Sequence, residues 1–154
     1  MKKVLVATIV TAMVALAGTA MAAGSMPLTV EATVTAGCGI VNTSPVSFTI
    51  DPASASPATA IGGATVWCST GTNGTVIING NGLHESGGEK YMQSASTPTA
   101  SIRYTLNVPA PAVPGSGRTN TINVPINGTV AVADFQNAVA LDDYSDTVTV
   151  EINP

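Results

Sequence analysis

The residues that could support catalysis or metal binding are few and widely separated in this 154-residue sequence. The single histidine, His84, lies beside Glu85 in a glycine-rich stretch, and one imidazole excludes any site that needs two. A metal site at His84 would need Glu85 and Glu89 to converge with it on one point. We expect an exposed loop histidine instead, because nothing in this spacing brings several ligands together.

Three aspartates near the end of the chain, Asp142, Asp143 and Asp146, are the other candidate metal ligands. Their spacing does not match an EF-hand loop and no glycine stands at its centre, so we expect solvated carboxylates at the start of a strand. The sequence also lacks a P-loop, a GxGxxG motif and a CxxC motif, and no serine is specifically paired with His84. We therefore predict a protein that is not an enzyme and that uses no cofactor or metal.

Charge is scarce throughout the sequence. Charged residues make up 9% of the chain and aromatic residues 4%, and the formal net charge is −4. Beyond the first three positions the basic residues are Lys90, Arg103 and Arg118, which stand apart, whereas binding to nucleic-acid phosphates needs clusters of lysine and arginine. We predict no nucleic-acid partner.

Residues 1–22 have the pattern of a secretory signal peptide. Two lysines precede an apolar run over residues 4–17, and the small residues Ala20 and Ala22 stand before the expected cleavage site. The apolar run is short for a membrane span and no later segment is long enough, so we expect an exported protein with no membrane anchor. Cleavage after Ala22 would leave three basic residues against nine acidic ones.

The two cysteines, Cys38 and Cys68, belong to a chain that is expected to be exported. An oxidising compartment favours a disulfide between them over a metal or redox site. Closing a loop of about 30 residues would stabilise the fold by roughly 3–4 kcal/mol. Trp67, next to Cys68, either stacks on a sugar ring or packs in a sandwich near the disulfide, and we expect the second.

Alternation of apolar and polar residues, which is the period of a β-strand, recurs along the chain, and no convincing helical period is present. Turn signals separate the alternating segments, among them residues 79–82 (NGNG) and Asn127-Gly128, and residues 53–60 and 109–117 are expected loops. Strands are predicted within residues 28–34, 46–50, 64–68, 75–78, 102–108, 122–126 and 144–152. Short strands at this spacing predict one all-β domain, an immunoglobulin-like β-sandwich.

The first and last predicted strands lie at the two ends of the mature chain. Residues 28–34 alternate strictly and follow a Gly-Ser-Met-Pro lead directly behind the signal peptide, and residues 144–152 run almost to the last residue. A terminal strand with such regular alternation needs a pairing partner. It adds either to this protein's own sheet or to the sheet of a neighbour.

Several segments resemble the archaic chaperone–usher pilins and the related spore-coat-U-like domains. The likeness lies in LTVEATVTAGC at residues 28–38, VWCS at 66–69, IRYTLN at 102–107, VPING at 124–128 and YSDTVTVEI at 144–152. The last two are similar to the VPVxG and Y-x-D-T-V-T-V-x-V patterns of that family. The resemblance covers essentially the whole mature chain.

Such pilins are immunoglobulin-like sandwiches that lack their final strand, and the resemblance implies an incomplete sandwich here. Residues 23–36 would be a donor-strand segment and residues 37–154 the pilin domain, whose apolar groove is filled by the segment of a neighbouring subunit through β-augmentation. The implied donor side chains are Leu28, Val30, Ala32 and Val34, and the implied residues at the edge of the acceptor groove are Tyr144, Val148, Val150 and Ile152.

The resemblance also implies partners and a location. A periplasmic chaperone would cap the exposed groove, an outer-membrane usher would assemble the subunits, and the product would be a cell-surface fimbria that supports adhesion or biofilm formation. The alternative is a self-contained, secreted coat or binding module in which residues 28–34 fold back into their own sheet. A secreted enzyme is a third possibility that would need a site this sequence does not display.

Overall fold

The computed structural model describes residues 26–80 and 82–154, and the expected signal peptide, residues 1–22, lies outside them. The chain divides into two compact units with the boundary after Thr33. In the first unit, residues 26–33 have no regular secondary structure and are exposed. The second unit contains the strands and the single short helix described in the structure.

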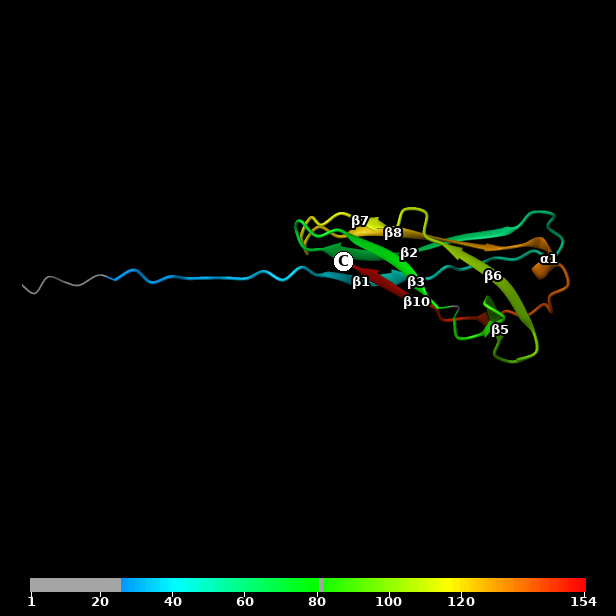
Figure 1. Cartoon of the computed structure of the whole chain (residues 1–154). Coiled ribbons are helices and arrows are strands. Elements are labelled where there is room, and N and C mark those ends of the chain that lie inside the picture. Colours follow the sequence, from blue (N-terminus) through cyan, green and yellow to red (C-terminus); the bar gives the residue numbers. More distant parts are fainter. Residues whose placement is uncertain (1–25, 81) are drawn as a thin grey trace, which may run out of the picture. The chain divides into compact units, whose positions relative to one another are not determined.

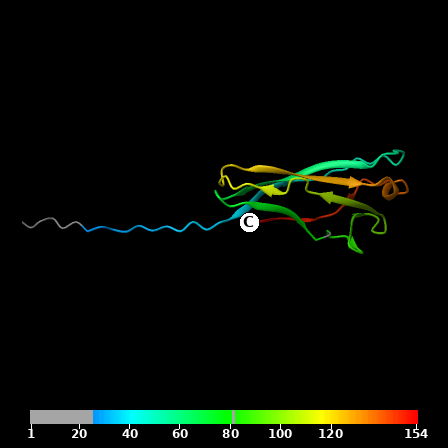
Figure 2. The same cartoon turned by 45° about the horizontal axis from the view of Figure 1, so that its top comes forward.

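The second unit is built from two antiparallel sheets (Figures 1 and 2). The larger sheet has the strand order β1 (Cys38–Ser44), β2 (Ala58–Cys68), β8 (Ile122–Val130), β6 (Ser101–Asn107), β5 (Glu89–Ser94), β4 (Glu85–Ser86), and β9 (Tyr144–Ser145) also pairs with β5. The smaller sheet has the order β10 (Thr149–Asn153), β3 (Gly74–Asn79), β7 (Ala112–Val113). A single helical turn, α1 (Val132–Phe135), follows β8.

These layers confirm the prediction of an all-β sandwich. Four of the predicted strands are found in β2, β3, β6 and β8, and the last predicted strand is divided into β9 and β10. The predicted loops at residues 53–60 and 109–117 are too long, because β2 already begins at Ala58 and β7 lies within the second loop. Residues 28–34 form no strand in the structure.

The prediction of a strand at residues 46–50 is wrong, because residues 45–57 belong to no strand. The chain leaves β1 by crossing close above β2, where a Cβ atom on the buried Gly62 would lie 2.6 Å from the carbonyl oxygen of Ser44. Only a glycine allows this close crossing. The crossing takes the chain off the sheet edge, so that the following residues lack a ladder to join.

The prediction of a turn at Asn127-Gly128 is also wrong, because both residues lie inside β8 and pair with β2 and β6. A Cβ atom on Gly128 would lie 2.5 Å from Val46 Cγ1 and 2.5 Å from Phe48 Cζ. The glycine is therefore required for a close approach between segments and not for a positive φ angle.

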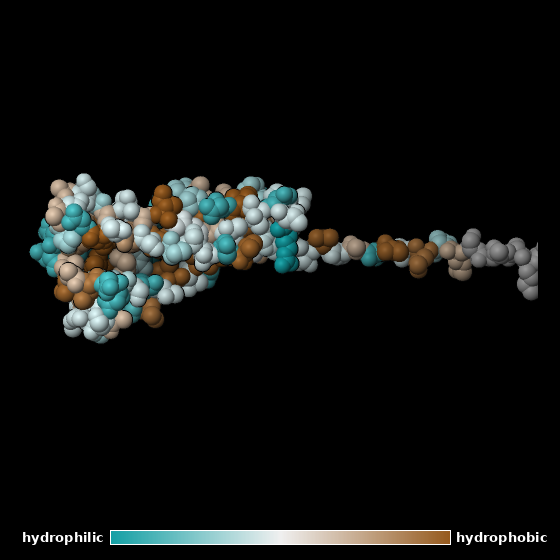
Figure 3. Space-filling model, turned by 180° about the vertical axis from the view of Figure 1, so that it is seen from behind, coloured by the Kyte–Doolittle hydropathy of each residue, from teal (hydrophilic) through white to brown (hydrophobic). Residues whose placement is uncertain are grey.

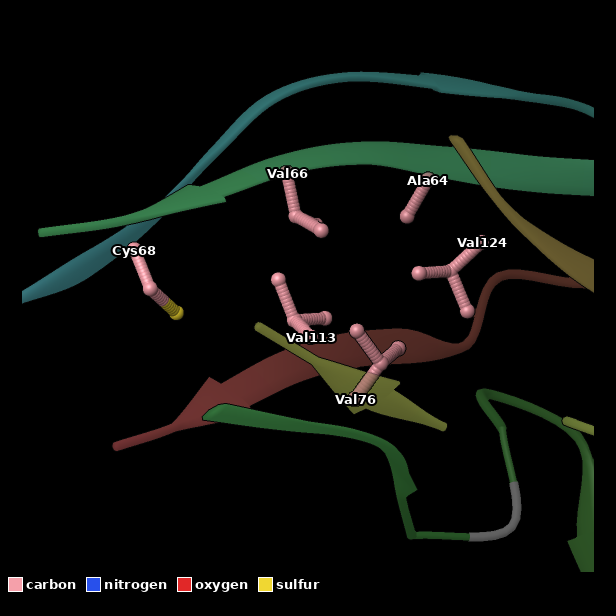
Figure 4. Packing of buried hydrophobic residues seen from close by; sticks show 6 residues of the cluster. All are labelled: Ala64, Val66, Cys68, Val76, Val113 and Val124. Carbon is pink, nitrogen blue, oxygen red and sulfur yellow. The ribbon is translucent and has the colours of Figure 1, made fainter. Parts of the chain in front are cut away.

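Buried small side chains fill the space between the two sheets near the β7 end of the sandwich (Figure 4). The six side chains of this cluster are at most 1% exposed, and they are Ala64, Val66, Cys68, Val76, Val113 and Val124. They come from β2 and β8 in one layer and from β3 and β7 in the other, and they point toward one another in Figure 4. We call this part of the domain the disulfide half.

A second buried cluster lies toward the end of the sandwich that carries α1 and β5 (Figure 1). Its buried members are Ile102, Tyr104, Val130 and Phe135. Larger side chains that are only half-buried surround them, among them Phe48, Met92 and Tyr144. We call this part the groove half. None of the helices described in residues 26–80 and 82–154 is long and apolar enough to cross a bilayer.

Candidate binding groove

An apolar groove of about 1140 Å³ lies over the second cluster and is open to solvent. One wall is formed by residues of the segment 43–52 and the other by residues of the segment 138–150. The floor is formed by side chains of β6, β8 and α1, namely Ile102, Tyr104, Leu106, Ile126 and Phe135. Figure 3 shows hydrophobic side chains gathered in a hollow on this face of the sandwich.

The groove exists because the smaller sheet covers only part of the larger one. β1 and β10 are edge strands of their sheets, and they contact each other in the disulfide half. Beyond Ser44 the chain no longer belongs to the sheet, and β10 begins only at Thr149. The two walls therefore diverge where no strand fills the space between them.

The first wall carries alternating apolar side chains although it is not a strand. Val46, Phe48 and Ile50 line the groove and are half-buried, while the residues between them are exposed. The ring of Phe48 packs against that of Tyr104 with the centroids 6.5 Å apart and the planes tilted by 57°. The sequence predicted a strand at residues 46–50 and did not predict that these residues form a wall of the groove.

The second wall contains three of the four residues expected at the groove edge. Tyr144, Val148 and Val150 line the groove and are half-buried. The hydroxyl of Tyr144 donates a hydrogen bond to the carbonyl oxygen of Val139 at 2.9 Å. Ile152 is not among the groove-lining residues, and it packs against the cluster of the disulfide half.

Asp146 is the polar centre of the second wall and is not the solvated carboxylate that was expected. Its Oδ1 accepts the backbone N–H groups of Leu83, at 2.9 Å, and of His84, at 3.2 Å, and its Oδ2 accepts the hydroxyl of Tyr104 at 2.6 Å. Burial, followed by this bond to the carboxylate, raises the pKa of Tyr104 well above its usual value. The phenol is therefore a hydrogen-bond donor not only at physiological pH but also at alkaline pH, where an ordinary tyrosine ionises.

Two other candidate ligands, Asp143 and His84, are also placed differently from expectation. Asp143 is half-buried, and hydrogen bonds from Ser96 and Ser94 lower the pKa of its carboxyl group. Asp142 is exposed, and His84 is half-buried rather than exposed. In residues 26–80 and 82–154 the structure brings no three histidine, cysteine or acidic side chains into an arrangement that could hold a metal.

The predicted disulfide between Cys38 and Cys68 is confirmed, with the Cα atoms 4.0 Å apart. The two residues face each other across the β1–β2 pair, so the bond joins neighbouring strands of one sheet. Trp67 points to the opposite face of β2, because successive side chains of a strand alternate. It does not pack in the core: its ring lies over Gly39, and the guanidinium carbon of Arg118 is 5.4 Å from the ring centroid.

The four residues expected to be donors are exposed and lie outside every strand. The exposed fraction is 87% for Leu28, 84% for Val30 and 87% for Val34, and Ala32 is also exposed. Met26 is 92% exposed and shares their alternation. The segment therefore presents a row of apolar side chains that nothing in the described chain covers.

An antiparallel β-sandwich with an apolar groove between two sheet edges defines the class of protein, and a family comparison identifies it more narrowly. Residues 25–151 match the family model of the Spore Coat Protein U domain, and the chain belongs to this family. The family consists of structural pilin and coat domains associated with the cell surface. A comparison with curated proteins finds no match.

Proposed function

We propose that this chain is a structural subunit of a surface fimbria assembled by the chaperone–usher pathway. The N-terminal segment, residues 23–36, of one subunit fills the groove of the next by donor-strand complementation. The observation that carries the proposal is the presence, in one chain, of an exposed alternating apolar segment and an unfilled apolar groove between two edge strands. Each supplies what the other lacks.

The energetics of this pairing are favourable but moderate. Burying Leu28, Val30, Val34 and the smaller Ala32 contributes on the order of 5–8 kcal/mol. Each backbone hydrogen bond to the groove walls adds about 0.5–1.5 kcal/mol. Ordering the donor residues costs roughly 1–2 kcal/mol for each residue, which offsets much of this gain. The persistence of the fibre would then depend in part on slow withdrawal of the strand.

The junction between the N-terminal segment and β1, at residues 34–37, favours donation to a neighbour over folding back. The backbone N–H of Ser69 donates to the carbonyl oxygen of Gly37 at 2.8 Å, and the N–H of Gly37 donates to Ser69 Oγ at 3.0 Å. Gly37, one residue before Cys38, therefore still pairs with the chain that follows β2. A reversal would have to occur at Val34-Thr35-Ala36, which contains none of the residues that favour tight turns.

The open groove also accounts for the proposed partners before assembly. An exposed apolar surface flanked by sheet edges promotes aggregation, so a periplasmic chaperone is required to cover it until an outer-membrane usher joins the subunits. The function of the assembled fibre in adhesion or biofilm formation is part of the proposal, and the location of the family at the cell surface supports it.

A pair of double variants tests donation with a matched control. Val30→Asp with Val34→Asp places charges on the apolar row of the donor, whereas Thr29→Asp with Thr33→Asp places the same charges on the alternate positions. We expect the first variant to abolish the fibres seen by electron microscopy and the SDS-resistant ladders that collapse on boiling. The second should retain both. Normal fibres from the first variant, or from a chain that lacks residues 27–35, would contradict the proposal.

The second candidate function is a self-contained coat or binding module, which the presence of coat domains in the family supports. The mature chain purified without a chaperone separates the two functions. A stable monomer whose backbone amides at residues 28–34 resist hydrogen exchange would favour the coat module. A chain that forms ladders, or that takes up a synthetic peptide of residues 26–36, would favour the fimbrial subunit.

A further inference from the structure

We infer that the Tyr104–Asp146 pair positions the two walls of the groove for the incoming donor segment. Both residues are positioning residues, because they act through the walls that meet the donor. The inference rests on the proposed function and adds to it a polar device inside a groove whose lining is otherwise mainly apolar.

Tyr104 connects the two walls through a single side chain. It belongs to β6 in the floor of the groove and is 6% exposed. Its ring packs against Phe48 of the first wall, with the centroids 6.5 Å apart. Its hydroxyl donates to Asp146 Oδ2 of the second wall at 2.6 Å. The separation of the two walls is therefore linked to the placement of one tyrosine.

Asp146 holds the part of the second wall that no sheet supports. β9 ends at Ser145 and β10 begins at Thr149, so residues 146–148 lie between two strands and pair with neither neighbouring ladder. Within this gap, Asp146 accepts the N–H groups of Leu83 and His84, and the N–H of Leu83 also donates to the carbonyl oxygen of Thr147 at 3.0 Å. Val148, which follows directly, faces the groove.

The loop that meets Asp146 is shaped for this contact. Gly82 has a φ angle of 97°, a conformation that favours glycine, and a Cβ atom there would collide with the Asp146 carboxylate. The carboxylate thus joins the loop after β3, the floor strand β6 and the second wall. Charge-assisted hydrogen bonds in a partly buried site are stronger than neutral ones, which suits them to holding a wall that lacks backbone pairing.

Uptake of a donor peptide by an assembly-defective full-length mature chain tests the inference. The chain carries Val30→Asp and Val34→Asp so that it cannot donate, and the probe is a fluorescent synthetic peptide of residues 26–36. Tyr104→Phe keeps the ring against Phe48 and removes only the hydroxyl, and Asp146→Asn removes the charge. We expect each to weaken peptide binding about tenfold or more, as the loss of a charge-assisted hydrogen bond predicts.

The double variant Tyr104→Phe with Asp146→Asn should bind the peptide about as weakly as the weaker single variant, because the two groups act as one unit. Tyr91→Phe, in β5, and Glu85→Gln, which is exposed in β4, lie outside the groove lining; they are the controls and should bind as the parent chain does. Hydrogen exchange should accelerate at residues 146–148 and remain unchanged along β2 and β8.

Each other result contradicts a specific claim. Parent-like peptide binding by both single variants would overturn the inference and leave the proposed function intact. Faster exchange throughout β2 and β8 would show a general structural role and would also overturn it. A parent chain that takes up no peptide would overturn the proposed function itself. If Asp146→Asn does not fold, Tyr104→Phe alone decides the question.

Discussion

The two halves of the sandwich are covered in different ways. In the disulfide half, side chains of β2 and β8 meet those of β3 and β7, and every member of the cluster is at most 1% exposed. In the groove half, the same larger sheet faces the two groove walls, and Phe48, Met92 and Tyr144 remain half-buried. The first half is a finished core and the second is a core with one side missing.

The residue types follow the same division. The buried residues of the finished half are valine, alanine and cysteine, with isoleucines at the margin, and they fill a narrow space between two close sheets. The groove half adds phenylalanine, tyrosine and methionine, which bury most area only when something covers them. The side chains that could bury the most apolar area therefore lie at the groove, which the fold leaves uncovered.

Phe135 supports the floor of the groove and is fully buried, so Phe135→Ala should lower the free energy of unfolding by about 3–5 kcal/mol. Denaturant unfolding measures this loss. Val113→Ala, which removes fewer atoms from the disulfide half, should cost less. A cost for Phe135→Ala below that of Val113→Ala would mean that the groove half contributes little to the folded state.

Replacing both cysteines, Cys38→Ser with Cys68→Ser, should lower the free energy of unfolding by roughly 3–4 kcal/mol, because the unfolded chain loses the constraint on a loop of about 30 residues. Hydrogen exchange should speed up first in β1 and the end of β2. Equal acceleration in the groove half would contradict the division into two halves.

Gly128→Ala should lower the free energy of unfolding by about 1–3 kcal/mol, because the added methyl group would push Val46 and Phe48 away from β8. Thermal unfolding of the chain measures the effect. Gly37 is the control, since a Cβ atom there meets no atom within 4 Å. A neutral Gly128→Ala would show that the first wall is free to shift outward.

The smallest effect concerns pH. The pKa of Asp143 is lowered in the folded chain by Ser96 and Ser94, so its contribution to stability is present above the pKa of the unfolded chain and is lost as the pH falls through the folded value. The loss should appear below about pH 4. Asp143→Asn should flatten this acid limb in denaturant unfolding, and an unchanged limb would show that the contacts with Ser96 and Ser94 add nothing to stability.

The sequence predicts the parts of this contrast that depend on local patterns. Alternation locates β2, β3, β6 and β8, and the two cysteines of an exported chain predict the disulfide. β1 is not predicted, because its register shifts between Ile40 and Asn42 and this shift breaks the alternation. β5, with the sequence EKYMQS, carries charged and polar residues along the edge region of the sheet and shows no apolar period.

The groove depends on contacts that no local pattern encodes. The alternation of Val46, Phe48 and Ile50 predicts a strand, and the prediction is wrong because no neighbouring strand reaches these residues to pair with them. Tyr104 and Asp146 are separated by 42 positions, and their hydrogen bond arises only from the crossing of β6 below the second wall. Asn127-Gly128 has the composition of a turn, and the close approach of Phe48 overrides that signal.

The position of the disulfide has a mechanical consequence. Cys38 is the first residue of β1 and follows Gly37, so a pull on the N-terminal segment reaches the folded domain at the cross-link. The covalent bond passes the load to β2, whose ladder with β8 contains nine residue pairs. Tension along β2 must shear these pairs together and cannot peel them one at a time. The domain thus receives the load from its N-terminal segment on a long ladder that reaches from the disulfide half to Val130 of the groove half.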